Sequence, residues 1–84
     1  MASTGFSSLA TEPALIDARG LKCPLPVLKM EKRLAELPPG AWLVVLATDP
    51  MAKIDIPLYC RQNGHTCRLE ADKDLLRFTI VKAS

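Results

Sequence analysis

Hydrophobic residues in the first half of the chain have the spacing of a strand followed by an amphipathic helix. A short apolar run at 14–16 ends at Asp17 and Gly20, which predicts a strand and then a tight loop. From Pro24 onward, apolar residues recur at steps of three and four, as on one face of a helix. This stripe consists of Val27, Met30, Leu34 and Leu37. The helix should end at the Pro-Pro-Gly segment 38–40, because proline cannot continue the backbone hydrogen bonds.

The middle of the chain predicts a buried strand and a second helix. Residues 42–47 are all apolar, so we expect a central strand with Trp42 in the core. The second helix should start near Lys53, with Pro57 in its first turn, where a missing N–H is tolerated. It should close at the Asn-Gly pair 63–64. The side chains expected to point inward are Ile54, Leu58 and Tyr59.

The last part of the chain predicts a hairpin that completes the fold. Residues 65–71 and 75–81 flank the turn 72–74, as two antiparallel strands would. The predicted order is therefore βαβαββ. Two helices that each follow a strand, with a closing hairpin, indicate an α/β (α+β) two-layer sandwich. We expect a mixed four-stranded sheet with both helices on one face.

Length and composition indicate one small domain. With 84 residues, 49% of them hydrophobic, the chain can bury one modest core, which we place at residues 14–82. Residues 1–13 contain no Lys or Arg and no long apolar run, so they predict a disordered tail rather than a signal peptide or membrane span. A net charge of +2 does not by itself imply direct nucleic-acid binding. We expect a monomer without direct membrane contact.

The number of cysteines indicates a reducing compartment. Cys23, Cys60 and Cys67 are odd in number and unevenly spaced, which argues against a disulfide framework. A cytoplasmic location is therefore expected.

Cys23 is the residue with the clearest predicted chemistry. With Pro24 at the first helical position, Cys23 takes the position of a cap, and Pro26 stiffens the turn. A sulfur there faces unpaired backbone N–H groups and the positive end of the helix dipole. Lys22 and Arg19 add positive charge nearby. All of these favour the thiolate, so we expect a reactive thiol with a lowered pKa.

Two blocks of residues resemble one known family. The first reads Asp17-x-x-Gly20-x-x-Cys23-Pro24-x-Pro26. The second reads Asp49-Pro50 followed by Asp55-Ile56-Pro57-x-x-Cys60-x-x-x-Gly64-His65. Together they resemble the TusA/SirA family of small sulfur carriers over about residues 14–82. The chain departs from that pattern at Thr48, where many relatives have an acid, and in its 13 leading residues.

The resemblance implies a βαβαββ fold and a sulfurtransferase that carries a persulfide on Cys23 without a cofactor. It implies a donor such as a cysteine desulfurase or rhodanese-like enzyme. The acceptor routes it implies are tRNA thiolation, molybdenum-cofactor sulfur supply and sulfur oxidation. Within the site, Gly20 is expected to be structural, through a positive φ or a close approach. Two roles stay open for Arg19, a charge clamp with Lys22 or a partner for Asp17.

The other cysteines and the histidine suggest weaker alternatives. The spacing of Cys60, His65 and Cys67 does not fit a zinc site, so we expect no metal. Cys60 is expected to be packed in the core, the alternative being a resolving thiol for Cys23.

Basic residues on the first helix leave a further choice open. Lys29, Lys32 and Arg33 form either a solvated face or a docking site for an acidic donor or acceptor protein. Two rival functions follow from these features: a non-catalytic module that binds RNA or a regulator, and a thiol redox switch that uses Cys23 and Cys60. The few aromatic residues argue against RNA binding.

Overall fold

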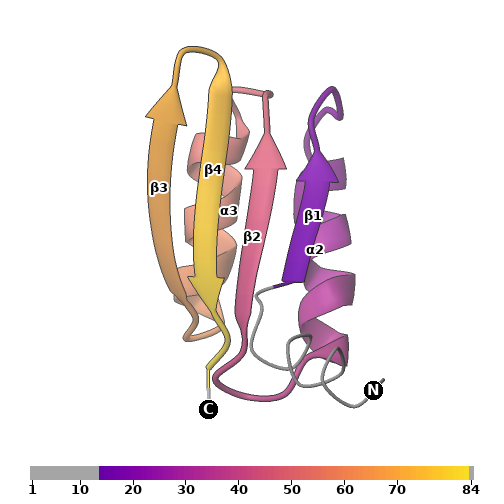
Figure 1. Cartoon of the computed structure of the whole chain (residues 1–84), viewed down its shortest axis with the longest axis vertical. Coiled ribbons are helices and arrows are strands. Elements are labelled where there is room, and N and C mark those ends of the chain that lie inside the picture. The colour runs from indigo at the N-terminus through magenta and orange to yellow at the C-terminus, as the bar shows by residue number, and fades with distance from the viewer. Residues whose placement is uncertain (1–13, 84) are drawn as a thin grey trace, which may run out of the picture.

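The chain alternates strands and helices in the predicted order (Figure 1). A computed structural model describes residues 14–83, so the predicted tail at 1–13 lies outside the described residues. The elements are β1 (Ala14–Ala18), α2 (Leu25–Glu36), β2 (Trp42–Ala47), α3 (Ala52–Gln62), β3 (Thr66–Asp72) and β4 (Leu75–Val81). Their bounds lie within two residues of the prediction.

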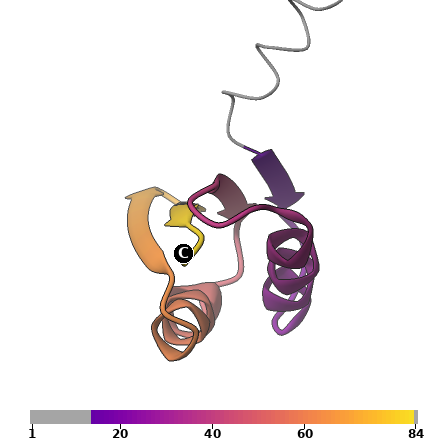
Figure 2. The same ribbon diagram turned by 90° about the horizontal axis from the view of Figure 1, so that it is seen from below.

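The strands form one mixed sheet with the order β1-β2-β4-β3. β1 and β2 are parallel, whereas β4 is antiparallel to both of its neighbours. Seen from below, α2 and α3 lie side by side under one face of the sheet (Figure 2). The predicted two-layer arrangement with both helices on one face is confirmed. Neither α2 nor α3 has the length and hydropathy needed to cross a membrane.

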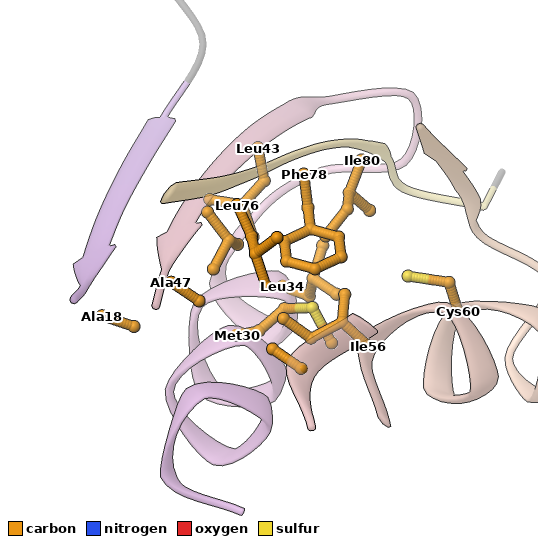
Figure 3. Close-up of a cluster of buried hydrophobic side chains, with 12 residues drawn as sticks. Ala18, Met30, Leu34, Leu43, Ala47, Ile56, Cys60, Leu76, Phe78 and Ile80 are labelled. Carbon is orange, nitrogen blue, oxygen red and sulfur yellow. The ribbon is translucent and has the colours of Figure 1, made fainter. Parts of the chain in front are cut away.

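The core lies between the sheet and the two helices (Figure 3). Leu76, Phe78 and Ile80 alternate along β4 and point toward the helices, as the two-residue period of a strand requires. Met30 from α2 and Ile56 from α3 complete the layer and are fully buried. Met30 belongs to the predicted stripe of α2, so the buried face of that helix is confirmed.

Trp42 lies on the uncovered face of the sheet and not in the core. Its side chain is 56% exposed, while its neighbour Leu43 is fully buried toward the helices. The prediction of a core Trp42 was wrong because helices cover one face of β2 only, so alternate side chains point away from them. A continuous apolar run does not show which residues face inward.

The buried face of α3 also differs from the prediction. Its inward side chains are those of Ala52, Ile56 and Cys60. Ile54 is 60% exposed and Leu58 is 43% exposed, so the expectation that both point inward was wrong. Residues four apart share one side of a helix, and the side that meets the sheet is the one with the smaller side chains. Tyr59 packs at the margin of the core, and Pro57 lies inside the helix rather than in its first turn.

The parallel pairing of β1 and β2 brings two distant loops together. Ala18 and Ala47, the last residues of the two strands, are register partners. Because parallel strands end at the same edge of a sheet, the loop 19–24 and the loop 48–51 leave that edge side by side. Cys23 lies in the first loop, and the second leads into α3.

Candidate active site

Asp49 joins the two loops through its carboxylate. Its Oδ2 accepts a hydrogen bond of 2.9 Å from the Cys23 backbone N–H, and its Oδ1 accepts one of 3.0 Å from the Met51 N–H. These bonds hold the pKa of Asp49 below its usual value, with the Cys23 N–H as the larger cause. The backbone of Cys23 is thereby fixed to the start of α3.

Gly20 makes a second link between the loops. Its N–H donates a hydrogen bond of 2.9 Å to Oγ1 of Thr48. Gly20 has a φ of +81°, and within residues 14–83 no atom beyond its two chain neighbours lies within 4 Å of the position that a Cβ would occupy. Glycine is therefore required here by its backbone conformation and not by crowding. Of the two expected structural roles, a positive φ and a close approach, the structure shows the first. The hydroxyl of Thr48 is suited to this contact because it accepts a hydrogen bond without adding charge.

Arg19 pairs with Asp17 and not with the sulfur. Its Nε and Nη2 donate to Oδ1 and Oδ2 of Asp17 at 2.8 and 2.7 Å, in a two-pronged ion pair. The side-chain hydrogen bond from Arg19 lowers the pKa of Asp17 to about 2, with a smaller contribution from the Arg19 backbone N–H. Of the two roles left open for Arg19, the structure favours the partner of Asp17.

The thiol of Cys23 is surrounded by acids. It is partly buried and lies within the electrostatic influence of Asp55 and Asp49. Burial, followed by the neighbouring Asp55 carboxylate and the charge of Asp49, raises the pKa of Cys23 to about 11. The expectation of a lowered pKa was therefore wrong. The nearby cation Lys22 acts on Asp49 instead, where its positive charge helps to lower the pKa of that carboxyl.

The start of α2 offers the sulfur fewer free N–H groups than predicted. Pro24 is the N-cap and Leu25 the first helical residue, one position later than expected. The Leu25 N–H donates to the Lys22 carbonyl at 2.9 Å. Pro24 and Pro26 have no N–H to offer, and the peptide bond between Cys23 and Pro24 is cis. The first turn therefore supplies little of the stabilisation that lowers the pKa of cysteines at other helix N-termini.

The predicted docking residues gather beside an edge strand. Lys29 and Lys32 are exposed on α2, and Arg33 pairs with Glu36 at 3.0 Å. Together with Ile16 of β1 these four side chains line a shallow pocket between the helix and the edge of the sheet. The structure thus places the three cations on one surface.

Cys60 and Cys67 both belong to the core. Cys60 is buried in α3, which confirms the prediction that it is packed, and Cys67 on β3 packs against the same core cluster. The Nδ1 of His65 accepts a hydrogen bond of 2.9 Å from the Ala83 N–H, and its ring stacks on Tyr59. Within residues 14–83, no three His, Cys, Asp or Glu side chains converge as metal ligands would.

The comparisons with known proteins agree with this arrangement. A family model described as sulfurtransferase TusA matches residues 14–82. The chain belongs to this family. The sulfur carrier protein TusA of Pseudomonas syringae pv. tomato is 40% identical over 75 residues, covering 88% of this chain and 89% of the relative. A provisionally named sulfur carrier protein of Neisseria meningitidis serogroup B is 46% identical over 66 residues, covering 79% and 88%.

A solved structure supports the fold independently. The SirA-like protein of Desulfitobacterium hafniense superimposes with a TM-score of 0.75 and 30% sequence identity. The match covers 84% of this chain and 99% of that protein. The resemblance to TusA and SirA proteins inferred from the two sequence blocks is confirmed, and with it a role as a sulfur carrier.

Sequence reasoning assigned no role to the two acids nearest the thiol. Asp49 was detectable, because a strand–helix–strand connection places β1 and β2 parallel, and residues after parallel strands meet at one edge. Asp55 was harder to find. Its position depends on the rotation of α3 about its axis, which the hydrophobic pattern predicted incorrectly.

Proposed function

We propose that this protein carries sulfur as a persulfide on Cys23, taking it from a donor protein and passing it to an acceptor protein. The observation that supports this most directly is the placement of Cys23 in a loop anchored by Asp49, where the Asp55 carboxylate acts on the pKa of its thiol. The proposed donors are a cysteine desulfurase or a rhodanese-like enzyme, and tRNA thiolation is the proposed example of an acceptor route. A cytoplasmic location belongs to the same proposal.

Asp55 gives the transfer a place for the proton. The Cys23 thiol loses its proton to the Asp55 carboxylate as its sulfur attacks the outer sulfur of the donor persulfide. The S–S bond of the donor breaks, its cysteine leaves as a thiolate, and Cys23 keeps the transferred sulfur. Asp55 then returns the proton to the departing thiolate.

Release to the acceptor repeats the exchange in the other direction. An acceptor thiolate attacks the outer sulfur of the Cys23 persulfide, and Cys23 leaves as a thiolate. The high pKa of Cys23 makes this thiolate a poor leaving group unless it is protonated. Asp55 takes a proton from the acceptor thiol as that thiol becomes the attacking thiolate, and passes this proton to the departing Cys23 sulfur, so the same carboxylate serves loading and release.

The predicted docking surface of Lys29, Lys32 and Arg33 belongs to this proposal as the approach for an acidic partner. Its support is the shared pocket beside Ile16 on the edge strand. Charges in such a position raise the rate of association more than the affinity.

The test is the mass of the protein after incubation with a cysteine desulfurase and cysteine. The wild type should gain about 32 Da, one sulfur atom, and lose it on reduction. Cys23→Ser should gain nothing, whereas Cys60→Ser and Cys67→Ser should gain the sulfur as the wild type does. Retention of the gain in Cys23→Ser, with its loss in either other variant, would place the sulfur elsewhere and overturn the proposal.

A further inference from the structure

β1 leaves one edge of the sheet open beside α2. In the strand order β1-β2-β4-β3, β1 pairs with β2 on one side, and within residues 14–83 no strand lies on its other side. Apart from the sheet pairing, no backbone–backbone hydrogen bond of the described chain involves residues 14–17. Alternate N–H and C=O groups along this outer edge are therefore available to a further strand.

The two edges of the sheet differ in the features that prevent strand addition. Charged side chains on an edge strand discourage pairing with another chain. β3, at the opposite edge, carries Arg68, Glu70 and Asp72. β1 carries a single charged residue, Asp17, which forms an ion pair with Arg19, and its remaining side chains are apolar. β1 is therefore the less protected of the two edges.

Cations of α2 lie beside this open edge. Lys29, Lys32 and Arg33 line the shallow pocket that they share with Ile16 of β1 and with Glu36. Arg33 pairs with Glu36, whereas the ion pairs in the described part of the chain leave out both lysines. Figure 2 shows why these side chains reach the edge, because α2 lies under the β1 end of the sheet and α3 under the β3 end. An occupant of this surface should therefore be extended and negatively charged.

We propose that the outer side of β1 binds an acidic segment of a partner protein, which adds to the sheet as an extended strand and places its carboxylates beside Lys29 and Lys32. Backbone hydrogen bonds hold the segment, and the two lysines select it by its charge. The inference deepens the docking role proposed above for the cations of α2, and it rests on the proposed sulfur transfer only for the identity of the partner.

The charges favour an acidic partner over a second copy of this chain. Symmetric pairing of two β1 strands would make one continuous sheet and place the two α2 helices side by side beneath it. Each copy would then bring Lys29, Lys32 and Arg33 to the same interface, where like charges repel. A segment of opposite charge meets no such repulsion.

The direction of β1 connects this docking to the thiol. β1 runs from Ala14 to Ala18, and the loop 19–24 that carries Cys23 leaves its end. At about 3.3 Å per residue, the strand offers a pairing edge of about 16 Å. A segment paired over this length has one end beside the loop of Cys23. The chain that continues from that end can deliver the partner's cysteine, because tethering raises the local concentration of a reacting group.

The experiment measures the binding of an acidic peptide to full-length Cys23→Ser by NMR. The probe is a heptapeptide of alternating Glu and Val with blocked ends, which carries the required charge and has Val at strand-forming positions. Binding should shift the signals of residues 14–18, Lys29 and Lys32, and it should slow amide exchange at alternate residues of β1. The signals of β3 should stay unchanged. Cys23→Ser has no thiol at position 23, so the result does not depend on sulfur transfer.

Two matched peptides separate strand addition from simple charge attraction. The same heptapeptide with every backbone amide N-methylated keeps its charges but donates no backbone hydrogen bond, so it should bind at least about tenfold more weakly. A heptapeptide with Lys in place of each Glu keeps the alternating pattern and reverses the charge. It should not bind.

Two double variants of the protein test the position of the site. Lys29→Glu combined with Lys32→Glu should weaken binding of the acidic heptapeptide about tenfold, because attraction to two cations becomes repulsion. Arg68→Glu combined with Lys73→Glu makes the same charge change on and beside β3 and should leave the affinity unchanged.

Four results would each overturn the proposal. They are equal binding of the N-methylated peptide, signal shifts confined to β3 or to the uncovered face of the sheet, no detectable binding at about 1 mM peptide, and tighter binding of a single-stranded oligonucleotide of equal charge at this edge. Absence of sulfur loading on Cys23 in the wild type would instead refute the proposed function, and it would leave these binding results unaffected.

Discussion

Replacing Asp55 by asparagine removes one negative charge beside the Cys23 thiol and keeps the size of the side chain. In the wild type, burial and the two nearby carboxylates raise the pKa of Cys23 from 9.0 to about 11. The Asp55 carboxylate causes part of this increase in pKa and is removed in the variant, whereas burial stays. We therefore expect the pKa of Cys23 in Asp55→Asn to fall by about one pH unit, part of the way back to its ordinary value.

The size of the effect on thiol reactivity follows from two opposing factors. A fall of one unit raises the thiolate fraction at neutral pH about tenfold. A less basic thiolate is a weaker nucleophile, so the rate constant of the thiolate itself falls by a factor of about three. Alkylation of Cys23 by iodoacetamide should therefore be about three times faster in Asp55→Asn than in the wild type.

Sulfur transfer should change in the opposite direction. If Asp55 accepts and returns the proton, Asp55→Asn should slow the loading of Cys23 by at least about tenfold, although its thiol is alkylated faster. Alkylation rates at Cys23 between pH 7 and pH 11 and loading by a cysteine desulfurase measure the two effects. Glu70→Gln, which removes the same charge from an exposed position on β3, is the matched control and should change neither.

Two outcomes would refute the reasoning in different ways. Faster alkylation together with faster loading would show that Asp55 raises the pKa of Cys23 without serving as the proton acceptor. Unchanged alkylation would show that the Asp55 carboxylate does not act on the thiol in solution.

Three further predictions concern stability and docking. Phe78→Ala should lower the free energy of unfolding by about 3–5 kcal/mol in urea denaturation, because the ring is fully buried at the centre of the core. Lys29→Glu combined with Lys32→Glu should slow sulfur transfer from an acidic donor and reduce its dependence on salt, because surface charges act through steering. The raised pKa of Cys23 stabilises the folded chain below about pH 9, and this contribution is lost as the pH rises to about 11. Cys23→Ser should therefore lose less stability than the wild type between those two pH values.

Two of these predictions have matched control variants, and the third is tested by the comparison with Cys23→Ser. Leu15→Ala removes a large side chain that is 62% exposed and should cost far less than Phe78→Ala. Arg68→Glu combined with Lys73→Glu makes the same charge change on and beside the far edge strand β3 and should leave transfer unaffected. A similar loss of transfer in this control would show that net charge and not the α2 surface controls the rate. Equal alkaline destabilisation of wild type and Cys23→Ser would contradict the pKa of Cys23.

The elements of the fold were predictable because their hydrophobic periods are local. The alternation along β4 and the stripe that includes Met30 each identify an element and its buried side from neighbouring residues. Trp42 and Ile54 show the limit of this method. Their burial depends on which face of the sheet, or which side of α3, the rest of the chain covers, and a run that is apolar throughout does not contain that information.

The position of the sulfur site in the sequence was predicted correctly, whereas the direction of the pKa shift of Cys23 was not. The residues before α2 were enough to identify Cys23, and the cations Arg19 and Lys22 beside it suggested an activated thiolate. In the folded chain Arg19 pairs with Asp17, the charge of Lys22 acts on the pKa of Asp49, and the pKa of the thiol is raised by Asp55 from a helix that begins 29 residues later. A pKa depends on the three-dimensional neighbourhood, which sequence-adjacent charges represent only in part.

The anchoring of Cys23 through its backbone has a consequence for how partners distinguish the empty carrier from the loaded one. The Asp49 carboxylate accepts hydrogen bonds from the N–H of Cys23 and the N–H of Met51, and neither bond involves the sulfur. The backbone of loop 19–24 is therefore expected to keep its conformation when a second sulfur is added to Cys23. Donor and acceptor bind the same backbone conformation in both states. They must therefore distinguish the two states by the persulfide group itself, which is longer and more acidic than the thiol. The direction of sulfur transfer, from donor to acceptor, then depends on the relative stability of the persulfide on each partner's cysteine.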